Sequence, residues 1–161
     1  MKILILIPNL KNIGGVGNYY KVLNLQVDDK IDYFEIGKSP NESIIKTIWR
    51  LIYNYTYFIS VLLRFKYDII HVNPSLDSKA FYRDSLFVFF ARIFRRKILV
   101  FFRGWDDNFY KKINKSKIKK FIFDKTFLNA TKIITLGQIF KEKILVLNKK
   151  IESRIIISST I

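Results

Sequence analysis

Short unbroken runs of apolar residues alternate along this chain with longer segments in which apolar positions recur at helical spacing. The first run, Ile3 to Ile7, ends at Pro8 and Asn9, as expected for a strand that is covered on both faces. Further apolar runs predict strands over 31–36, 67–72, 98–102, 132–136 and 154–158. The segments between them predict helices over 16–25, 43–66, 78–94, 117–129 and 138–147, with 103–107 as a loop. This alternation predicts an α/β fold in a single domain over 1–161: a Rossmann-like, doubly wound parallel sheet of about six strands with helices on both faces.

A glycine-rich loop separates the first predicted strand from the first predicted helix. Gly14, Gly15 and Gly17 stand in this loop and at the start of the helix. Such a loop favours an anion site, because glycine lets the backbone approach a phosphate or carboxylate while free N–H groups point at it. The alternative is a tight turn without a ligand. A dinucleotide-binding fingerprint matches only in part, since Tyr20 occupies the position of its third glycine.

Polar residues gather in the loops that follow the predicted strands. Ligands of open parallel sheets bind beyond the carboxyl ends of the strands, so we expect the loops 9–18, 73–79, 103–108 and 137–138 to meet at one cleft. Their polar residues are Asn9, Asn18, Asn73, Ser75, Asp77, Arg103, Asp106, Asp107 and Gln138.

The composition favours a packed core and an anionic partner. Half of the 161 residues are hydrophobic, which argues against disorder. The 29 basic and 13 acidic residues give a formal net charge of +16, which favours nucleic acid, phosphorylated substrates or an acidic membrane surface as partners. A generally lysine-rich composition without a specific partner is the alternative. With no Cys and one His we expect no metal site, and we expect His71 to be a hydrogen-bonded structural residue inside its strand.

Two stretches are candidates for contact with a membrane surface. The helix 43–66, which Asn41 or Ser43 is placed to cap, is apolar nearly all round and carries Trp49 and Tyr53. Charged residues interrupt it too often for a bilayer span. The second stretch is rich in lysine and includes Lys111, Lys112, Lys115 and Lys119. Together they predict an aromatic and basic edge for anionic lipid head groups. The alternatives are burial of the helix against the sheet, and a solvated face or mobile loop for the lysines.

Five segments of the chain carry a family resemblance through their order and spacing. They read K-I-L-I-L-I-P with G-G-V-G-N-Y-Y, then Y-D-I-I-H-V-N-P-S, I-L-V-F-F-R-G-W-D, N-A-T-K-I-I-T-L and R-I-I-I-S-S-T-I. This order resembles the N-terminal domain of family-4 retaining glycosyltransferases with the GT-B fold, over nearly the whole chain. The resemblance implies that this domain binds the acceptor, a glycan or lipid-linked molecule. It also implies that a C-terminal domain absent from this chain binds the nucleotide-sugar, that no cofactor belongs to this domain, and that the chain alone is inactive in transfer.

The resemblance also assigns residues to the cleft. It places Gly14, Gly15, Gly17 and Asn18 on the loop facing the donor phosphates or the acceptor, and Asn73 and Ser75 on the loop after the third strand. Arg103, Trp105 and Asp106 fall near the reaction centre, where the family usually has His-Gly and a nearby Asp; Arg103 replaces that His.

Three roles are expected of this last group. Arg103 is suited to clamping a phosphate or carboxylate, Asp106 to accepting hydrogen bonds from acceptor hydroxyls, and Trp105 to stacking on a sugar. Arg103 and Asp106 are therefore the catalytic candidates. The alternatives are an ion pair of Arg103 with Asp106 or Asp107, and simple packing of Trp105.

The chain is therefore expected to be one half of an enzyme that transfers sugars in surface polysaccharide synthesis. This enzyme would act in the cytoplasm or peripherally on the inner face of the plasma membrane. A stand-alone basic module for nucleic acid is a second hypothesis, which the scattered basic residues and the lack of a nucleic-acid motif disfavour. A third is a regulatory interaction domain without catalysis.

Overall fold

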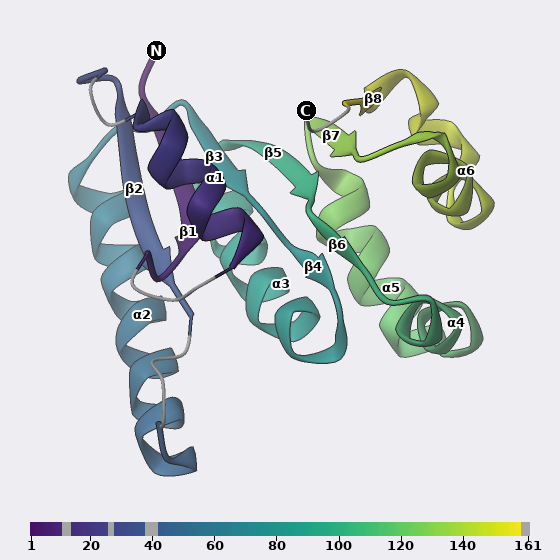
Figure 1. The fold of residues 1–161 in the computed structure, drawn as a ribbon, viewed down its shortest axis with the longest axis horizontal. Helices are drawn as coiled ribbons and strands as arrows, with labels where there is room; N and C mark the ends of the chain where they lie inside the picture. The colour runs from purple at the N-terminus through teal and green to yellow at the C-terminus, as the bar shows by residue number, and fades with distance from the viewer. Residues whose placement is uncertain (11–13, 26–27, 38–41, 159–161) are drawn as a thin grey trace.

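A six-stranded parallel sheet forms the centre of the molecule (Figure 1). The computed structural model describes residues 1–10, 14–25, 28–37 and 42–158. The strands of this sheet are β1 (Ile3–Pro8), β2 (Ile31–Ile36), β3 (Ile69–Val72), β5 (Lys97–Phe102), β7 (Lys132–Thr135) and β8 (Ile155–Ile157). They lie in the order β2-β1-β3-β5-β7-β8, and every neighbouring pair is parallel. The predicted doubly wound α/β fold is confirmed, with the order reversal of such sheets between β1 and β3.

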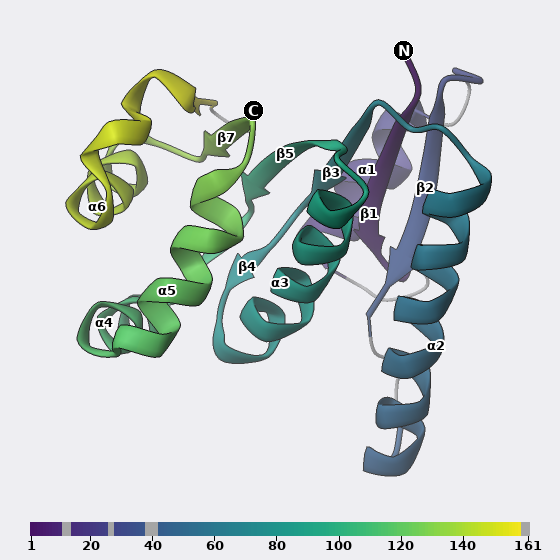
Figure 2. The same cartoon turned by 180° about the vertical axis from the view of Figure 1, so that it is seen from behind.

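Helices cover both faces of the sheet. They are α1 (Gly15–Leu23), α2 (Ile44–Arg64), α3 (Ser78–Ile93), α4 (Asp107–Lys115), α5 (Lys117–Lys125) and α6 (Gln138–Leu147), with short 3-10 helices at Phe127–Asn129 and Lys149–Arg154. In Figure 1 α1 lies in front of the sheet, whereas Figure 2 shows α2 and α3 on the opposite face.

The core has two parts because side chains of a strand alternate between the faces of a sheet. Leu4 and Leu6 of β1 join the larger cluster, which includes Phe58 of α2 and Phe87 of α3. Their neighbours in β1 belong to a smaller cluster with the buried Tyr20 of α1. The unbroken apolar run of β1 is therefore buried on both faces, as its sequence predicts.

The segment after β5 differs from the prediction of a loop followed by one helix. Residues 107–115 form α4, in which Phe109 and Ile113 are buried one turn apart. Ser116 ends α4 and caps α5, since its hydroxyl accepts a hydrogen bond from the N–H of Lys119. The alternative of a mobile loop for the lysines is therefore wrong, because two apolar residues at helical spacing suffice to dock a short helix despite its lysines. The helix predicted over 117–129 is split at Thr126 into α5 and a 3-10 turn.

A second, two-stranded sheet was not predicted. The strands β4 (Ser75–Leu76) and β6 (Gly104–Trp105) pair in parallel beyond the carboxyl ends of β3 and β5. This pairing ties together two of the loops that were expected to form the cleft.

Helix α2 is buried over only part of its length. Its second half contributes Phe58, Val61 and Leu62 to the core, whereas Trp49 in its first half is 68% exposed. The first half extends past the end of the sheet (Figure 1). Ser43 caps the helix by accepting a hydrogen bond from the N–H of Lys46, and the alternative cap Asn41 lies outside the described residues. Over the described part of the chain, no helix combines the length and apolar character that a bilayer crossing requires.

Candidate functional site

Two adjoining pockets lie at the carboxyl ends of the strands, around the start of α1. The first, about 690 Å³, is lined by Gly15, Val16, Asn18, Tyr19, Val22, Leu23, Arg103 and Leu136. The second, about 210 Å³, is lined by Leu6, Pro8, Val16, Ile36, Asn73, Ser75, Asp77, Ala80 and Arg83. Val16 lines both, so the pockets flank the first turn of α1. We call them the α1 pocket and the β3 pocket. They lie at the switch point between β1 and β3, where doubly wound sheets bind their ligands.

The guanidinium of Arg103 is held between two aromatic rings. Its Cζ lies 3.9 Å from the ring centroid of Tyr19 on α1 and 3.7 Å from that of Phe101 on β5. The ring of Tyr20 lies farther away, at 5.8 Å. Arginine stacks on aromatic faces through its planar, weakly hydrated guanidinium. The two rings thus fix the plane of the guanidinium at the wall of the α1 pocket.

Asn73 connects Arg103 to β1 and α1. Its Oδ1 accepts hydrogen bonds from the Tyr20 hydroxyl at 2.9 Å and from Nε of Arg103 at 3.4 Å. Its Nδ2 donates to the carbonyl of Leu6 at 3.0 Å. Burial raises the pKa of Tyr20 while Arg103 and Asn73 lower it, so the phenol remains a neutral donor at pH 7. The network immobilises the inner edge of the guanidinium.

No carboxylate among the described residues pairs with Arg103. The ranges outside the description contain neither Asp nor Glu, so all 13 acidic residues of the chain are covered. The alternative of an ion pair with Asp106 or Asp107 is wrong, because both carboxylates are engaged elsewhere. Asp106 caps α4 through the N–H groups of its second and third residues. Asp107 pairs with Lys143 and accepts a hydrogen bond from the Trp105 indole N–H.

His71 lies in β3 beneath this group. Its ring is parallel to that of Phe101, with centroids 6.5 Å apart. Burial, together with the positive charge of Arg103, lowers the pKa of His71 to about 4, so the imidazole is neutral at pH 7. The expected position in a strand is confirmed. The expected hydrogen bond is not found at Nε2, which is buried without a partner among the described residues.

Gly14 and Gly15 at the start of α1 are not required by packing. A Cβ on Gly14 or Gly15 would meet no heavy atom within 4 Å. Within the described residues no side chain caps α1 or α6, in contrast to α2, α3, α4 and α5. Gly17 is buried within the helix and Asn18 is exposed. The first turn of α1 therefore offers open space and N–H groups at the edge of the α1 pocket.

The β3 pocket holds polar groups that the sequence only partly predicted. Asn73 and Ser75 line it as expected, together with Asp77, whose carboxylate caps α3. Arg83 lines it as well, and its Nε donates to the fully buried Asp84 at 2.6 Å. Sequence reasoning missed this pair and the aromatic clamp of Arg103. Two adjacent opposite charges in the middle of a mostly apolar helix were the signal for the pair.

Trp105 lies away from both pockets. Its indole stacks on Phe140 of α6, with ring centroids 5.0 Å apart and planes inclined by 24°. It also contacts Phe102 and Tyr110. The structure therefore groups Gly15, Asn18 and Arg103 in one pocket and Asn73 and Ser75 in the next, while Trp105 and Asp106 belong to the packing and capping of the neighbouring helices.

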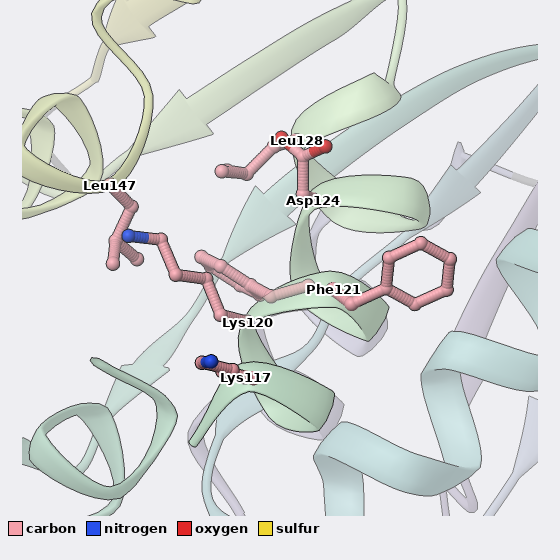
Figure 3. A pocket seen from close by; sticks show the side chains of 7 residues that line it. Lys117, Lys120, Phe121, Asp124, Leu128 and Leu147 are labelled. Carbon is pink, nitrogen blue, oxygen red and sulfur yellow. The ribbon is translucent and has the colours of Figure 1, made fainter. Parts of the chain in front are cut away.

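The lysine-rich segment lies on the solvated sides of α4 and α5. Lys111, Lys112 and Lys115 are exposed and Lys119 is half-buried. Lys117 and Lys120 line a separate pocket of about 350 Å³ beside Leu147, and Figure 3 shows the Lys120 side chain reaching toward that residue. The only acid of that pocket, Asp124, accepts a hydrogen bond from Asn148. The structure thus retains a strongly basic surface on these two helices.

Three chains of solved structures are similar to this one. No family model and no curated protein matches this chain. Its structure is similar to the crystal structure of Anabaena Alr3699/HepE in complex with UDP, with a TM-score of 0.48 and 13% sequence identity. The match covers 99% of this chain and 44% of that one, so this chain spans less than half the length of that protein.

Proposed function

We propose that this chain is the acceptor-binding half of a glycosyltransferase that moves a sugar from a nucleotide-sugar to a glycan or lipid-linked acceptor in surface polysaccharide synthesis. The ordered motifs quoted above support this proposal. The observation that carries it is the pair of adjoining pockets at the strand ends, which are lined by the start of α1 and by several polar groups. A sugar ring presents hydroxyls and apolar faces, and these pockets offer partners for both.

The role of such a domain is positioning. Sugar transfer requires one acceptor hydroxyl to be held against the anomeric carbon of the donor, and orientation of this kind lowers the barrier substantially. In this proposal Asn73, Ser75 and Asp77 orient acceptor hydroxyls in the β3 pocket. Gly14, Gly15, Gly17 and Asn18 border the α1 pocket, where the backbone of the first helical turn approaches the ligand. A second domain supplies the nucleotide-sugar, so transfer requires both.

The proposed place of action is an anionic membrane surface. Six large apolar side chains on the first half of α2 are about half or more exposed: Ile44, Ile45, Ile48, Trp49, Ile52 and Tyr53. An exposed apolar patch of this kind marks an interaction site, and isoleucine with aromatic residues suits the interface of a lipid layer. The lysines of α4 supply attraction to anionic head groups.

Ligand-observed NMR on the chain tests acceptor binding. The probes are the methyl glycosides of glucose, galactose and N-acetylglucosamine at millimolar concentration, alone and as disaccharides. We expect saturation transfer to at least one probe, and its loss in Gly15→Val, which fills the α1 pocket, and in Asn18→Ala. Asn114→Ala is the matched control, since Asn114 is also an exposed helical asparagine. If no sugar binds, including the acidic sugars named in the next subsection, the proposal is contradicted. Binding that Gly15→Val leaves unchanged contradicts it as well, and so does sugar transfer by this chain alone.

A further inference from the structure

We infer that the acceptor is anionic, and that its carboxylate or phosphate group pairs with Arg103 in the α1 pocket. The inference rests on the proposed function and narrows its substrate class from sugars in general to acidic ones.

The guanidinium of Arg103 is held rigidly by its neighbours. Its centre is 3.9 Å from the Tyr19 ring and 3.7 Å from the Phe101 ring, and Nε is tied to Asn73. A long side chain ordinarily loses rotamer freedom when it binds a ligand, which reduces the affinity gained. Here the protein itself has ordered the side chain. A guanidinium held flat presents a fork that matches the two oxygens of a carboxylate or phosphate.

Arg103 has no counter-charge among the described residues. Of the other half-buried arginines, Arg50 pairs with Glu42 and Arg83 with Asp84, whereas Arg96 and Arg154 donate to backbone carbonyls. Arg103 is also half-buried, yet its polar neighbours among the described residues, Asn73 and Tyr20, are neutral. A partly desolvated cation without an anion is unfavourable unless a partner arrives. Because no acidic residue of this chain supplies that partner, the ligand is the source that fits.

The lining of the α1 pocket suits an anionic sugar. No acid contributes to it, and apart from Arg103 and the Asn18 amide its side chains are aromatic or aliphatic, with glycine at one edge. An anionic sugar would meet no like charge here, and the pocket of about 690 Å³ has room for a sugar ring. The apolar face of the sugar ring, which presents C–H groups, would contact Val16, Val22 and Leu136, while the charged substituent of the ring reaches Arg103.

A carboxylate and a phosphate are distinguished by two matched pairs of probes. Methyl β-D-glucuronide is compared with methyl β-D-glucoside, and glucose 6-phosphate with glucose, so that each pair differs only in the anionic group. We expect the anionic member of at least one pair to bind at least tenfold more tightly, which corresponds to about 1.4 kcal/mol. Preference within the first pair identifies a uronic acid, and preference within the second identifies a phosphorylated acceptor.

Three variants connect the preference to Arg103. Arg103→Gln removes the charge and is expected to abolish the preference. Arg103→Lys keeps the charge but loses the fork, so we expect an intermediate preference that falls more steeply with salt. Arg64→Gln removes one exposed arginine from the end of α2 and is expected to leave the preference unchanged. Thermal unfolding of each variant verifies the fold, and the lysine variant decides the outcome if the glutamine variant is unfolded.

The outcomes separate this inference from the proposed function. Equal binding of neutral and anionic probes overturns the inference and leaves the acceptor proposal in place. A preference that survives in Arg103→Gln, or that Arg64→Gln reduces equally, also overturns it, because the effect is then one of net charge. Binding of no sugar, acidic or neutral, contradicts both. If inorganic phosphate binds as tightly as glucose 6-phosphate, the site binds anions without recognising the sugar. That result overturns the assignment of an acidic acceptor.

Discussion

Gly104 on β6 lies against Ser75 on β4 so closely that a Cβ on the glycine would stand 2.8 Å from the serine Oγ and 3.1 Å from its Cβ. The two residues are partners in the short parallel sheet that joins the loops after β3 and β5. A side chain at position 104 would therefore collide with the side chain of Ser75, which would have to shift. The contact also holds Arg103 and Asn73 next to each other, since each lies one or two residues from the pair.

Gly104→Ala is expected to lower the free energy of unfolding by about 1–3 kcal/mol, the usual cost of overpacking. Urea unfolding measures the change. Gly14→Ala is the matched control, because its Cβ enters open space, and it should change stability by less than about 0.5 kcal/mol. In a double-mutant cycle Ser75→Gly should recover part of the loss. Simple additivity of the two substitutions would show that this contact is not the cause.

His71 should make stability depend on pH. Its pKa is lowered from 6.5 to about 4 in the folded chain, so between these values the unfolded chain binds more protons than the folded one. The free energy of unfolding therefore rises with pH from about 4 to 6.5 and falls as the pH drops through this window, by up to about 3 kcal/mol from this group.

As the only histidine of the chain, His71 gives one imidazole signal in a proton NMR titration. We expect its midpoint near 4, and a higher midpoint in Arg103→Gln because the neighbouring positive charge is removed. In His71→Phe the free energy of unfolding should depend less on pH between about 4 and 6.5. A midpoint near 6.5 in the unmodified protein would be incompatible with the burial described above.

Tyr19 should set the affinity of Arg103 for an anion without supporting the fold. Tyr19 is 37% exposed, and its ring stacks on the guanidinium. Tyr19→Ala is expected to weaken binding of the preferred anionic sugar by about two- to fivefold, since one cation–π contact of about 0.5–1 kcal/mol is lost. Tyr19→Phe keeps the ring and should bind as the unmodified chain does. Titration by NMR with thermal unfolding as a stability check measures both, and equal weakening by the two substitutions argues against the clamp.

The exposed half of α2 and the lysines of α4 should direct binding to anionic vesicles. Sedimentation with vesicles containing phosphatidylglycerol should exceed that with pure phosphatidylcholine and should decrease with salt. Trp49→Ala should weaken binding through lost apolar contact. The double substitution Lys111→Gln, Lys112→Gln should weaken it by about 2 kcal/mol, at about 1 kcal/mol for each basic residue.

Lys149→Gln with Lys150→Gln is the matched control, because these exposed lysines lie in the 3-10 helix after α6. An equal effect of the two lysine pairs would assign vesicle binding to net charge alone. Preference for single-stranded DNA over anionic vesicles at the same ionic strength would favour the nucleic-acid hypothesis instead.

The buried pair Arg83–Asp84 should be the most costly to break. Asp84 is fully buried and bonds both Nε and Nη2 of Arg83. Asp84→Ala leaves a buried cation unpaired and is expected to cost about 3–5 kcal/mol in urea unfolding. Asp29→Ala, at an exposed aspartate, should be close to neutral. The double substitution Arg83→Met, Asp84→Leu should be much less harmful than Asp84→Ala alone, and failure of this rescue would point to a role for the pair beyond charge balance.

Local sequence pattern was sufficient for most of the fold. The strand predicted over 31–36 and the helix predicted over 138–147 match β2 and α6 residue for residue. Both signals are local, because apolar runs and helical periodicity express how one segment buries its own side chains. The pattern failed at α4, where lysines obscured the spacing of Phe109 and Ile113, and at the two-residue strands β4 and β6, which are too short to show a period.

The candidate site divides in the same way. The sequence by itself determined that Gly15, Asn73 and Arg103 follow buried strands, and parallel topology then brings such loops to one edge of a sheet. Only the tertiary structure decided what each side chain contacts: that Arg103 lies between Tyr19 and Phe101, and that Trp105 stacks on Phe140. The physical reason is that a side chain's partners come from separate elements, and their choice depends on which strands are neighbours and on how far each loop extends past them.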